Sequence, residues 1–289
     1  TALQNVARWT GSSWVDVGGG IDLGAAGCMG TLSEDRYHLG TGIYDLHVHG
    51  GQLYAAGGSL NVNLNSNVYV LSQGTWNVVG GGTNFAVTDM ASLGNKLYVG
   101  GFFNSAGQSP AGHVAAWNGS NWETLAGGVA SGFNTSVTAL ATTASNLYAG
   151  GTFSTIGGKS ANNIARWDGN QWHALGSGVN GKVFDLLVSG SDLYVAGDFT
   201  QAGSVVTGGI ARWDGSQWHP LGTGLTGDVT VLAGAVDLEV LDGKLWIGGN
   251  FDWAGNKPSD DLAIWDGGLI AQADGFESAS LNIWSRTVP

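Results

Sequence analysis

The stretch from Val183 to Gly222, VFDLLVSGSDLYVAGDFTQAGSVVTGGIARWDGSQWHPLG, decides the fold, because most of the chain repeats its pattern. Two apolar runs, Val183 to Val188 and Leu193 to Phe199, are joined by a short turn that contains glycine, which predicts a β-hairpin. Two further runs, Ile210 to Trp213 and Trp218 to Leu221, are separated by Asp-Gly, a strong turn signal. The stretch therefore predicts four antiparallel strands.

The second strand of this unit recurs along the chain. It starts with Leu-Tyr or Leu-Trp, and its copies begin at Leu53, Leu97, Leu147, Leu193 and Leu245. The steps between these leucines are 44, 50, 46 and 52 residues. Four short strands repeated at about 40 to 50 residues are typical of β-propeller blades, so the sequence predicts an all-β propeller.

Two further features of the repeat predict close packing. One glycine of the second strand is invariant among the copies, at Gly57, Gly101, Gly151, Gly197 and Gly249. We expect a neighbouring backbone or ring to lie too near these residues for a Cβ atom. Tryptophans recur in pairs five residues apart, at Trp9/Trp14, Trp117/Trp122, Trp167/Trp172 and Trp213/Trp218. Rings of this size favour packing between blades.

The number of copies predicts five blades, with six as the alternative. Residues 1–20 contain only the third and fourth strands of a unit, and Leu262 to Trp265 is a third strand near the other end. We therefore expect the ring to close with N- and C-terminal strands sharing one blade, which leaves no free sheet edge. This predicts one propeller domain over residues 1–270, a loop inserted at 20–42, and a C-terminal tail over 271–289.

A strand that ends in Gly-Gly, followed by a spaced aromatic pair around a tight turn, resembles the kelch repeat of galactose-oxidase-like propellers. The likeness covers Ile43 to Gly267 and reappears in Val6 to Gly18. It departs in detail, since Trp in Trp-Asp-Gly stands where kelch repeats usually have Tyr. The resemblance implies a propeller but no single function, because such propellers include binding scaffolds as well as oxidases.

The charge balance excludes some classes of partner. The net charge is −12 with only ten Lys plus Arg, which disfavours binding to nucleic acid or to anionic membrane surfaces. No apolar run is long enough to span a bilayer, so we expect no membrane insertion. These features predict a monomer whose partner is a glycan or a protein surface.

The sequence also favours a location outside the cytoplasm. Lysines are few, the single cysteine Cys28 permits no intrachain disulfide, and Ala273 to Ser285 (ADGFESASLNIWS) resembles the DGFES-type segment that ends many secreted bacterial proteins. We expect an extracellular or periplasmic bacterial protein. Any signal peptide is expected to be absent from the chain as given.

One position of the first strand is aspartate in four of five copies: Asp45, Asp89, Asp185 and Asp237, with Ala139 in the remaining one. The first strand is innermost in a propeller blade, so these carboxylates are expected at one level around the channel. A ring of oxygens is suitable for calcium. The alternative, which repetition favours, is a structural latch in which each carboxylate accepts backbone hydrogen bonds from the next blade.

A second group of candidates breaks the repeat. His47 and His49 lie two residues apart on one strand face, and Tyr37 and His38 precede them in the inserted loop. Two imidazoles side by side are suitable for a transition metal or a polar ligand, although two buried histidines by chance are the commoner case. We predict ligand binding at these four residues.

Three hypotheses for function remain open. The first is a binding module for a glycan or protein surface, with the ligand on the face that carries the loops between second and third strands, where binding residues usually lie. The second is a carbohydrate-active enzyme that uses the channel carboxylates Asp185, Asp237 and Glu239. The third is a structural component outside the cell. The sequence favours binding over catalysis.

Overall fold

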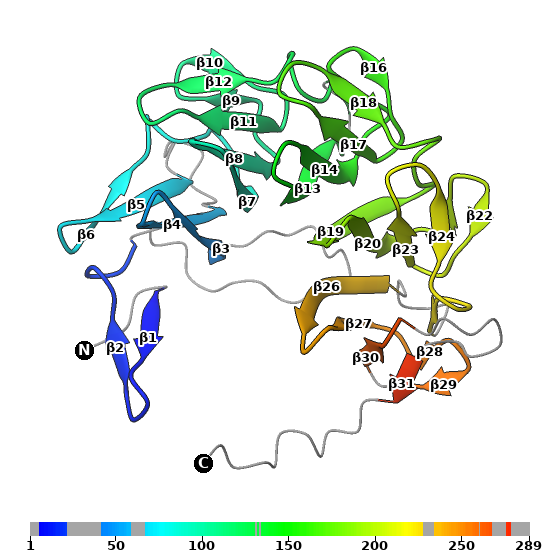
Figure 1. Cartoon of the computed structure of the whole chain (residues 1–289). Helices are drawn as coiled ribbons and strands as arrows, with labels where there is room; N and C mark the ends of the chain where they lie inside the picture. Colours follow the sequence, from blue (N-terminus) through cyan, green and yellow to red (C-terminus); the bar gives the residue numbers. More distant parts are fainter. Residues whose placement is uncertain are drawn as a thin grey trace. The chain divides into compact units, whose positions relative to one another are not determined.

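The computed structural model describes residues 6–21, 42–58, 67–130, 132, 134–227, 234–259, 261–267 and 276–278. All regular elements within these residues are β-strands, and they pair antiparallel in small sheets (Figure 1). In this described part of the chain, five sheets have four strands each, and we call them blades one to five in chain order. The predicted all-β fold of four-stranded antiparallel sheets is therefore confirmed.

Within each blade, the four strands pair side by side in the order in which they occur along the chain. Blade one contains β3 (Gly42–His49), β4 (Gln52–Gly58), β5 (Val68–Ser72) and β6 (Thr75–Val78). Blade two contains β7 (Val87–Leu93), β8 (Lys96–Gly101), β11 (Val114–Trp117) and β12 (Trp122–Thr124). Blade three contains β13 (Ser136–Thr142), β14 (Leu147–Thr152), β17 (Ile164–Trp167) and β18 (Trp172–Ala174). Blade four contains β19 (Lys182–Ser189), β20 (Asp192–Asp198), β23 (Ile210–Trp213) and β24 (Trp218–Pro220). Blade five contains β26 (Gly234–Leu241), β27 (Lys244–Asn250), β30 (Leu262–Trp265) and β31 (Phe276–Ser278).

The connection between second and third strands in blades two to five is a short hairpin. These loop hairpins are β9 (Ser105–Ala106) with β10 (Ser109–Pro110), β15 (Thr155–Ile156) with β16 (Lys159–Ser160), β21 (Gln201–Ala202) with β22 (Val205–Val206), and β28 (Trp253–Ala254) with β29 (Lys257–Pro258). A further strand, β25 (Leu225–Thr226), pairs with β28. Each hairpin is fixed by a buried Phe and a buried small or branched residue, as Phe103 and Ala106 show in blade two.

The chain divides into two compact units. The first consists of residues 1–147, 155–158 and 168–171, and the second consists of residues 148–154, 159–167 and 172–289. Blades one and two belong to the first unit, and blades four and five belong to the second. The division passes through blade three.

The chain termini do not pair as predicted in the described residues. β1 (Ala7–Trp9) and β2 (Trp14–Asp16) form a two-stranded sheet of their own, which we call the half-blade. The fourth strand of blade five is β31, which comes from the stretch expected to be a C-terminal tail. Blade five thus has four strands without the N-terminal ones, because Leu262–Trp265 pairs with β27 as the third strand and Phe276–Ser278 pairs with β30 as the fourth.

The invariant glycine of the second strand allows first and second strands to approach closely. A Cβ atom on Gly101 would lie 2.1 Å from the carbonyl oxygen of Ala86, and one on Gly197 would lie 2.0 Å from that of Lys182. Gly57 has the same environment, 2.1 Å from the oxygen of Gly42. The predicted close approach is therefore confirmed at these three positions, where the approaching group is a backbone carbonyl at the start of the first strand.

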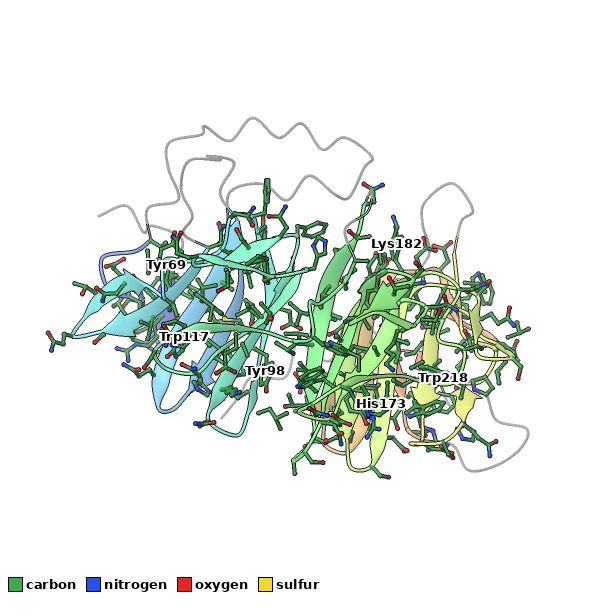
Figure 2. All side chains as sticks on the ribbon, turned by 90° about the horizontal axis from the view of Figure 1, so that it is seen from above. Tyr69, Tyr98, Trp117, His173, Lys182 and Trp218 are labelled. Carbon is green, nitrogen blue, oxygen red and sulfur yellow. The ribbon has the colours of Figure 1, made fainter. Side chains whose placement is uncertain are left out.

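The tryptophan pairs pack between successive blades. The indole N–H of Trp122 donates to the carbonyl of Val79 at 3.3 Å, and that of Trp218, labelled in Figure 2, donates to Leu175 at 2.9 Å. Each acceptor lies at the end of the preceding blade's fourth strand. Trp122 also belongs to a buried cluster formed by blades one and two. The predicted packing role is confirmed for these residues.

Candidate functional site

Three of the four predicted aspartates connect neighbouring blades. Each accepts a hydrogen bond of 2.5–3.0 Å from a backbone N–H on the first strand of the following blade, in the pairs Asp45 with Met90, Asp89 with Leu140, and Asp185 with Leu238. Asp89 and Asp185 also accept the N–H of the residue that follows them, at 2.7 Å. The latch offered as an alternative from the sequence is therefore formed at three junctions.

A register shift typical of a β-bulge precedes each of the four aspartates of the column. The register between first and second strands shifts between Ile43 and Asp45, Val87 and Asp89, Val183 and Asp185, and Ala235 and Asp237. An extra residue at this point bends the strand and changes the direction in which the next side chain points. Among the described residues, no group of three or more His, Cys, Asp or Glu side chains could hold a metal ion. Calcium at this column stays a prediction.

Asp185 has a strongly perturbed carboxyl environment. Burial, reinforced by the negative charges of Asp237 and Glu239, raises its pKa to about 6, against the lowering effect of two backbone N–H donors. Asp237 and Glu239 lie two residues apart on β26 and are exposed. The three predicted catalytic carboxylates therefore share one electrostatic environment in the second unit.

His47 and His49 converge on one hydroxyl group. His47 Nε2 lies 2.7 Å and His49 Nδ1 lies 2.8 Å from Oγ of Ser92, which is on β7 of blade two. Burial and the neighbouring His49 lower the pKa of His47. The other two predicted ligand-binding residues, Tyr37 and His38, lie outside the described residues.

Ser92 is a partner that the sequence analysis missed. At its position the other copies have Val48, Thr142, Val188 and Val240. All four of these residues are β-branched. A serine among them, in the strand next to the one with two unusual histidines, is the signal from which Ser92 could have been predicted. The resulting cluster joins blades one and two with polar side chains.

A polar depression of about 300 Å³ lies beside the loop hairpin of blade four. Its lining consists of Asn162, Asn163, Ser177, Gly178, Val179, Asn180, Gln201 and Gly203. Asn180 acts as a clamp, because its Oδ1 accepts the N–H groups of Thr200 and Gln201, each at 2.9 Å. Asn162 donates to the carbonyl of Ser177 at 2.9 Å. These bonds hold the walls of the depression in place.

A second depression of about 320 Å³ shares Ser177 and Gly203 with the first. It is lined by Gly176, Ser177, Gly203, Ser204, Val205, Trp213, Ser216, Gln217 and Trp218. Two of the strands that carry its lining, β22 with Val205 and β24 with Trp218, lie side by side (Figure 1). We call the two depressions together the amide groove. None of the residues that line it is charged.

The sequence predicted the loops on which the groove lies but not its residues. Gln201 differs from its counterparts in the other copies, whereas Asn67 stands at the Asn163 position and Asn84 at the Asn180 position, where its Oδ1 accepts the N–H groups of Asn104 and Ser105 in the same way. The groove forms only because the hairpin of blade four approaches the end of blade three. Tertiary packing of this kind has no local signal in the sequence.

Comparisons with known proteins found similar folds among solved structures. No protein-family model matches it, and no curated protein matches it. A solved structure of the extracellular domain of a hybrid two-component system from B. thetaiotaomicron matches 83% of this chain and 27% of that one, at 10% identity and a TM-score of 0.50. A likeness at this identity concerns the fold alone.

Two other solved structures are similar at lower scores. The computationally designed Ika8 protein matches 79% of this chain and 59% of that one, at 16% identity and a TM-score of 0.47. The β-propeller domain of the trilobed protease from Pyrococcus furiosus matches 78% of this chain and 67% of that one, at 12% identity and a TM-score of 0.47. The repeated four-stranded sheets support a β-propeller fold. In the part of the chain that the structure describes, no helix is long and apolar enough to cross a membrane.

Proposed function

We propose that this chain is an extracellular, kelch-like β-propeller module that binds a neutral glycan in the amide groove. The observation that carries the proposal is the lining of the groove, which combines amide, hydroxyl and apolar side chains and contains no charged residue. The chain has 10 Lys plus Arg and 22 Asp plus Glu, and none of them lines the groove. It is suited to a ligand that is polar and uncharged.

The chemistry of the lining supports a sugar in particular. Sugar hydroxyls both donate and accept hydrogen bonds, and Asn and Gln side chains present a donor and an acceptor on one planar group. Val205 contributes apolar surface against which the C–H face of a sugar ring can pack, and the buried Trp213 and Trp218 also border the depression. Each depression has a volume at the lower end of the range for small-ligand sites. Two adjoining depressions are suited to successive units of a glycan chain.

The first test is a binding assay with the purified chain on a panel of neutral and acidic polysaccharides, with released sugars measured in parallel. We expect binding to neutral polysaccharides, without products. Gln201→Ala and Gln217→Ala each remove a hydrogen-bonding amide at the groove and should weaken binding about tenfold, the effect of losing about 1.4 kcal/mol. Gln171→Ala, at the Gln217 position of blade three and outside the groove, is the matched control.

Two results would contradict the glycan proposal. One is absence of binding to every polysaccharide. The other is binding that Gln201→Ala, Gln217→Ala and Gln171→Ala leave equally unchanged, which would locate the ligand elsewhere. A protein partner or a structural role would then be the leading hypothesis.

Hydrolysis of a glycan is the second candidate function, favoured by the environment of Asp185. A carboxyl group whose pKa is raised to about 6 keeps a proton to donate near neutral pH, as the general acid of a glycosidase must. Release of sugars in the panel, abolished in Asp237→Ala and Glu239→Ala, is the expected result. Turnover that survives both substitutions would exclude the proposed catalytic role.

Calcium binding at the aspartate column is tested separately from glycan binding. A ligand that binds only the folded chain raises its melting temperature by mass action. Millimolar calcium should raise the melting temperature above the value in magnesium at equal ionic strength if the column holds the ion. Equal melting temperatures would leave these aspartates with the latch role alone.

A further inference from the structure

Three polar side chains from neighbouring blades converge at the junction of blades one and two. His47 and His49 are alternate residues of β3, so their side chains lie on one face of that strand. His47 Nε2 and His49 Nδ1 lie 2.7 Å and 2.8 Å from the same atom, Oγ of Ser92 on β7. The two ring nitrogens are therefore no farther apart than the sum of these distances, 5.5 Å. We call these three residues the histidine cluster.

The scaffold does not require the histidine cluster. Where blade one has His47, the other blades have Ala91, Ala141, Leu187 and Glu239. Where blade one has His49, they have Leu93, Thr143, Ser189 and Leu241. At the junction of blades one and two, Asp45 already makes the bond of the latch, to the N–H of Met90 at 3.0 Å. The two imidazoles are therefore an addition to the repeat rather than a part of it.

A hydroxyl group is an incomplete partner for two imidazoles. Ser92 has one proton, so it can donate to only one of the two ring nitrogens, and the other histidine must donate its own N–H to Oγ. A metal ion makes no such distinction, because it accepts the lone pair of both nitrogens. His47 then carries its proton on Nδ1 and His49 carries its proton on Nε2, and both are ordinary tautomers of a neutral imidazole. A shared metal ion therefore satisfies both nitrogens in the same way.

The surroundings of the histidine cluster favour binding of an ion. His47, His49 and Ser92 are half-buried rather than fully enclosed. Burial and the neighbouring His49 lower the pKa of His47, and the neutral imidazole is the form that binds a metal ion. The ring of His49 packs edge-on against Tyr54, with ring centroids 6.0 Å apart, which restricts its orientation. Ligands that are already positioned lose less freedom when an ion binds.

The donor atoms decide the class of ion. Imidazole nitrogen is suited to zinc and the neighbouring transition metals, whereas calcium and magnesium prefer oxygen ligands. In the described part of the chain, no group of three or more His, Cys, Asp or Glu side chains could hold a metal ion, so a hydroxyl group and water must complete a site built on two imidazoles. Closed sites with four protein ligands are typical of structural zinc, and sites that keep a water are open to a further ligand.

We propose that His47, His49 and the hydroxyl group of Ser92 form an open binding site for a divalent transition-metal ion, zinc in particular, at the junction of blades one and two. The two imidazoles supply the main bonds, the hydroxyl group supplies a weaker one, and water occupies the remaining position. The bound ion connects the first strands of the two blades and is accessible to a further ligand. The proposal depends on neither glycan binding nor calcium binding.

The first test titrates zinc chloride into the full chain, purified without a histidine tag, by isothermal titration calorimetry near neutral pH. We expect saturable binding of one ion per chain. The melting temperature should rise with zinc but not with an equal concentration of magnesium, because an ion that binds only the folded chain stabilises it. Absence of saturable binding, or an equal response to magnesium, would overturn the proposal.

Matched variants locate the ion. His47→Gln and His49→Gln each leave an amide that can still bond to Ser92, and each should weaken zinc binding at least about tenfold, because even changes outside the ligands cost that much. His173→Gln removes an imidazole in blade three and should leave binding unchanged. Ser92→Cys, kept reduced, should strengthen binding at least about tenfold, because thiolate is a better zinc ligand than a hydroxyl group.

Two results with these variants would contradict the site. One is zinc binding that both His47→Gln and His49→Gln leave unchanged, which would locate the ion elsewhere. The other is a Ser92→Cys variant that binds zinc no more tightly than the parent chain, because the ion would then not lie beside Oγ of Ser92.

A measurement on the parent chain covers the case in which the variants do not fold. Diethyl pyrocarbonate modifies neutral imidazoles, and mass spectrometry gives the extent of modification at each histidine. Zinc should protect His47 and His49 from the reagent, because their lone pairs are then bonded to the ion, and it should leave His173 unprotected. Modification of His47 and His49 that zinc does not change, including modification near zero with and without the ion, would refute the site.

Discussion

At the scale of single residues, glycines at the end of the second strand differ in how closely other atoms approach them. In blade four, Gly197 faces the carbonyl oxygen of Lys182 at a distance no side chain tolerates. In blade five, Gly248, at the preceding position of the repeat, has no atom within 4 Å of the place of a Cβ. The sequence predicted the first of these effects because the glycine is invariant among the copies.

Substitution by alanine should separate the two positions. We expect Gly197→Ala to lower the free energy of unfolding by about 3 kcal/mol, because the hairpin must open to admit a methyl group. Gly248→Ala should change it by no more than about 0.5 kcal/mol. Denaturant titration of both variants measures the difference. Equal effects would show that the close approach of the two strands is not what requires glycine.

The aspartate latch predicts a second stability effect. Asp89 accepts the N–H groups of Met90 and Leu140. Asp89→Ala leaves both donors without this acceptor, so we expect a loss of about 2 kcal/mol in the free energy of unfolding. Asp252→Ala, at an exposed aspartate that directly precedes β28, provides a control with the same change in charge. A loss no larger than that of the control would argue against the latch.

The pKa of Asp185 predicts the sign of a pH effect. Because its pKa in the folded chain, about 6, lies above the ordinary value of 3.8, the folded state binds the proton more tightly than the unfolded state. Its contribution to stability is therefore fully present below about pH 4 and is lost as the pH rises through 6. Asp237 and Glu239 act in the same direction, while the N–H groups of Leu186 and Leu238 oppose the shift.

Asp185→Asn should remove this pH dependence. On acidification from pH 7.5 to 4.5, the parent chain should gain stability relative to the variant, as measured by denaturant midpoints at both values. Comparing the two proteins cancels the titration of groups that they share, such as His47. A difference that is constant with pH, or that shrinks on acidification, would contradict the raised pKa.

At the scale of elements, identical tryptophans differ in what they contribute. Trp218 is buried and donates to Leu175, whereas Trp14 occupies the same position of the half-blade and is mostly exposed. Trp218→Phe should cost about 2 kcal/mol through lost packing and an unpaired carbonyl. Trp14→Phe should cost no more than about 0.5 kcal/mol. Thermal or denaturant unfolding of the pair checks this, and a large effect at Trp14 would mean that the half-blade is covered in solution.

The elements themselves were largely predictable, and their pairing at the ends was not. Alternating apolar residues and Asp-Gly turns predict all four strands of blade four to within about two residues. The loop hairpins were expected to be loops, because strands of two residues are too short for a pattern of alternation. The position of Phe276–Ser278 as a fourth strand was also missed, since three residues after a glycine resemble a tail as much as a strand.

At the scale of the whole molecule, the repeat determines the fold, and departures from the repeat determine the sites. The aspartates, glycines and tryptophans that recur were assigned structural roles from the sequence, and the structure confirms those roles at the junctions described above. The amide groove could not be predicted, because its residues come from separate segments that meet only after folding. Ser92 could have been predicted, because the other copies have a β-branched residue at its position.

The direction of the aspartate latch has a consequence for how the protein is made. Asp45, Asp89 and Asp185 each reach forward along the chain, to an amide roughly one repeat later. A blade that leaves the ribosome therefore has a carboxylate without its donor from the next blade until the next first strand has been synthesised. A junction of this kind cannot form during synthesis until about one further blade has been made, and each new blade then supplies the amide that holds the carboxylate of the blade before it.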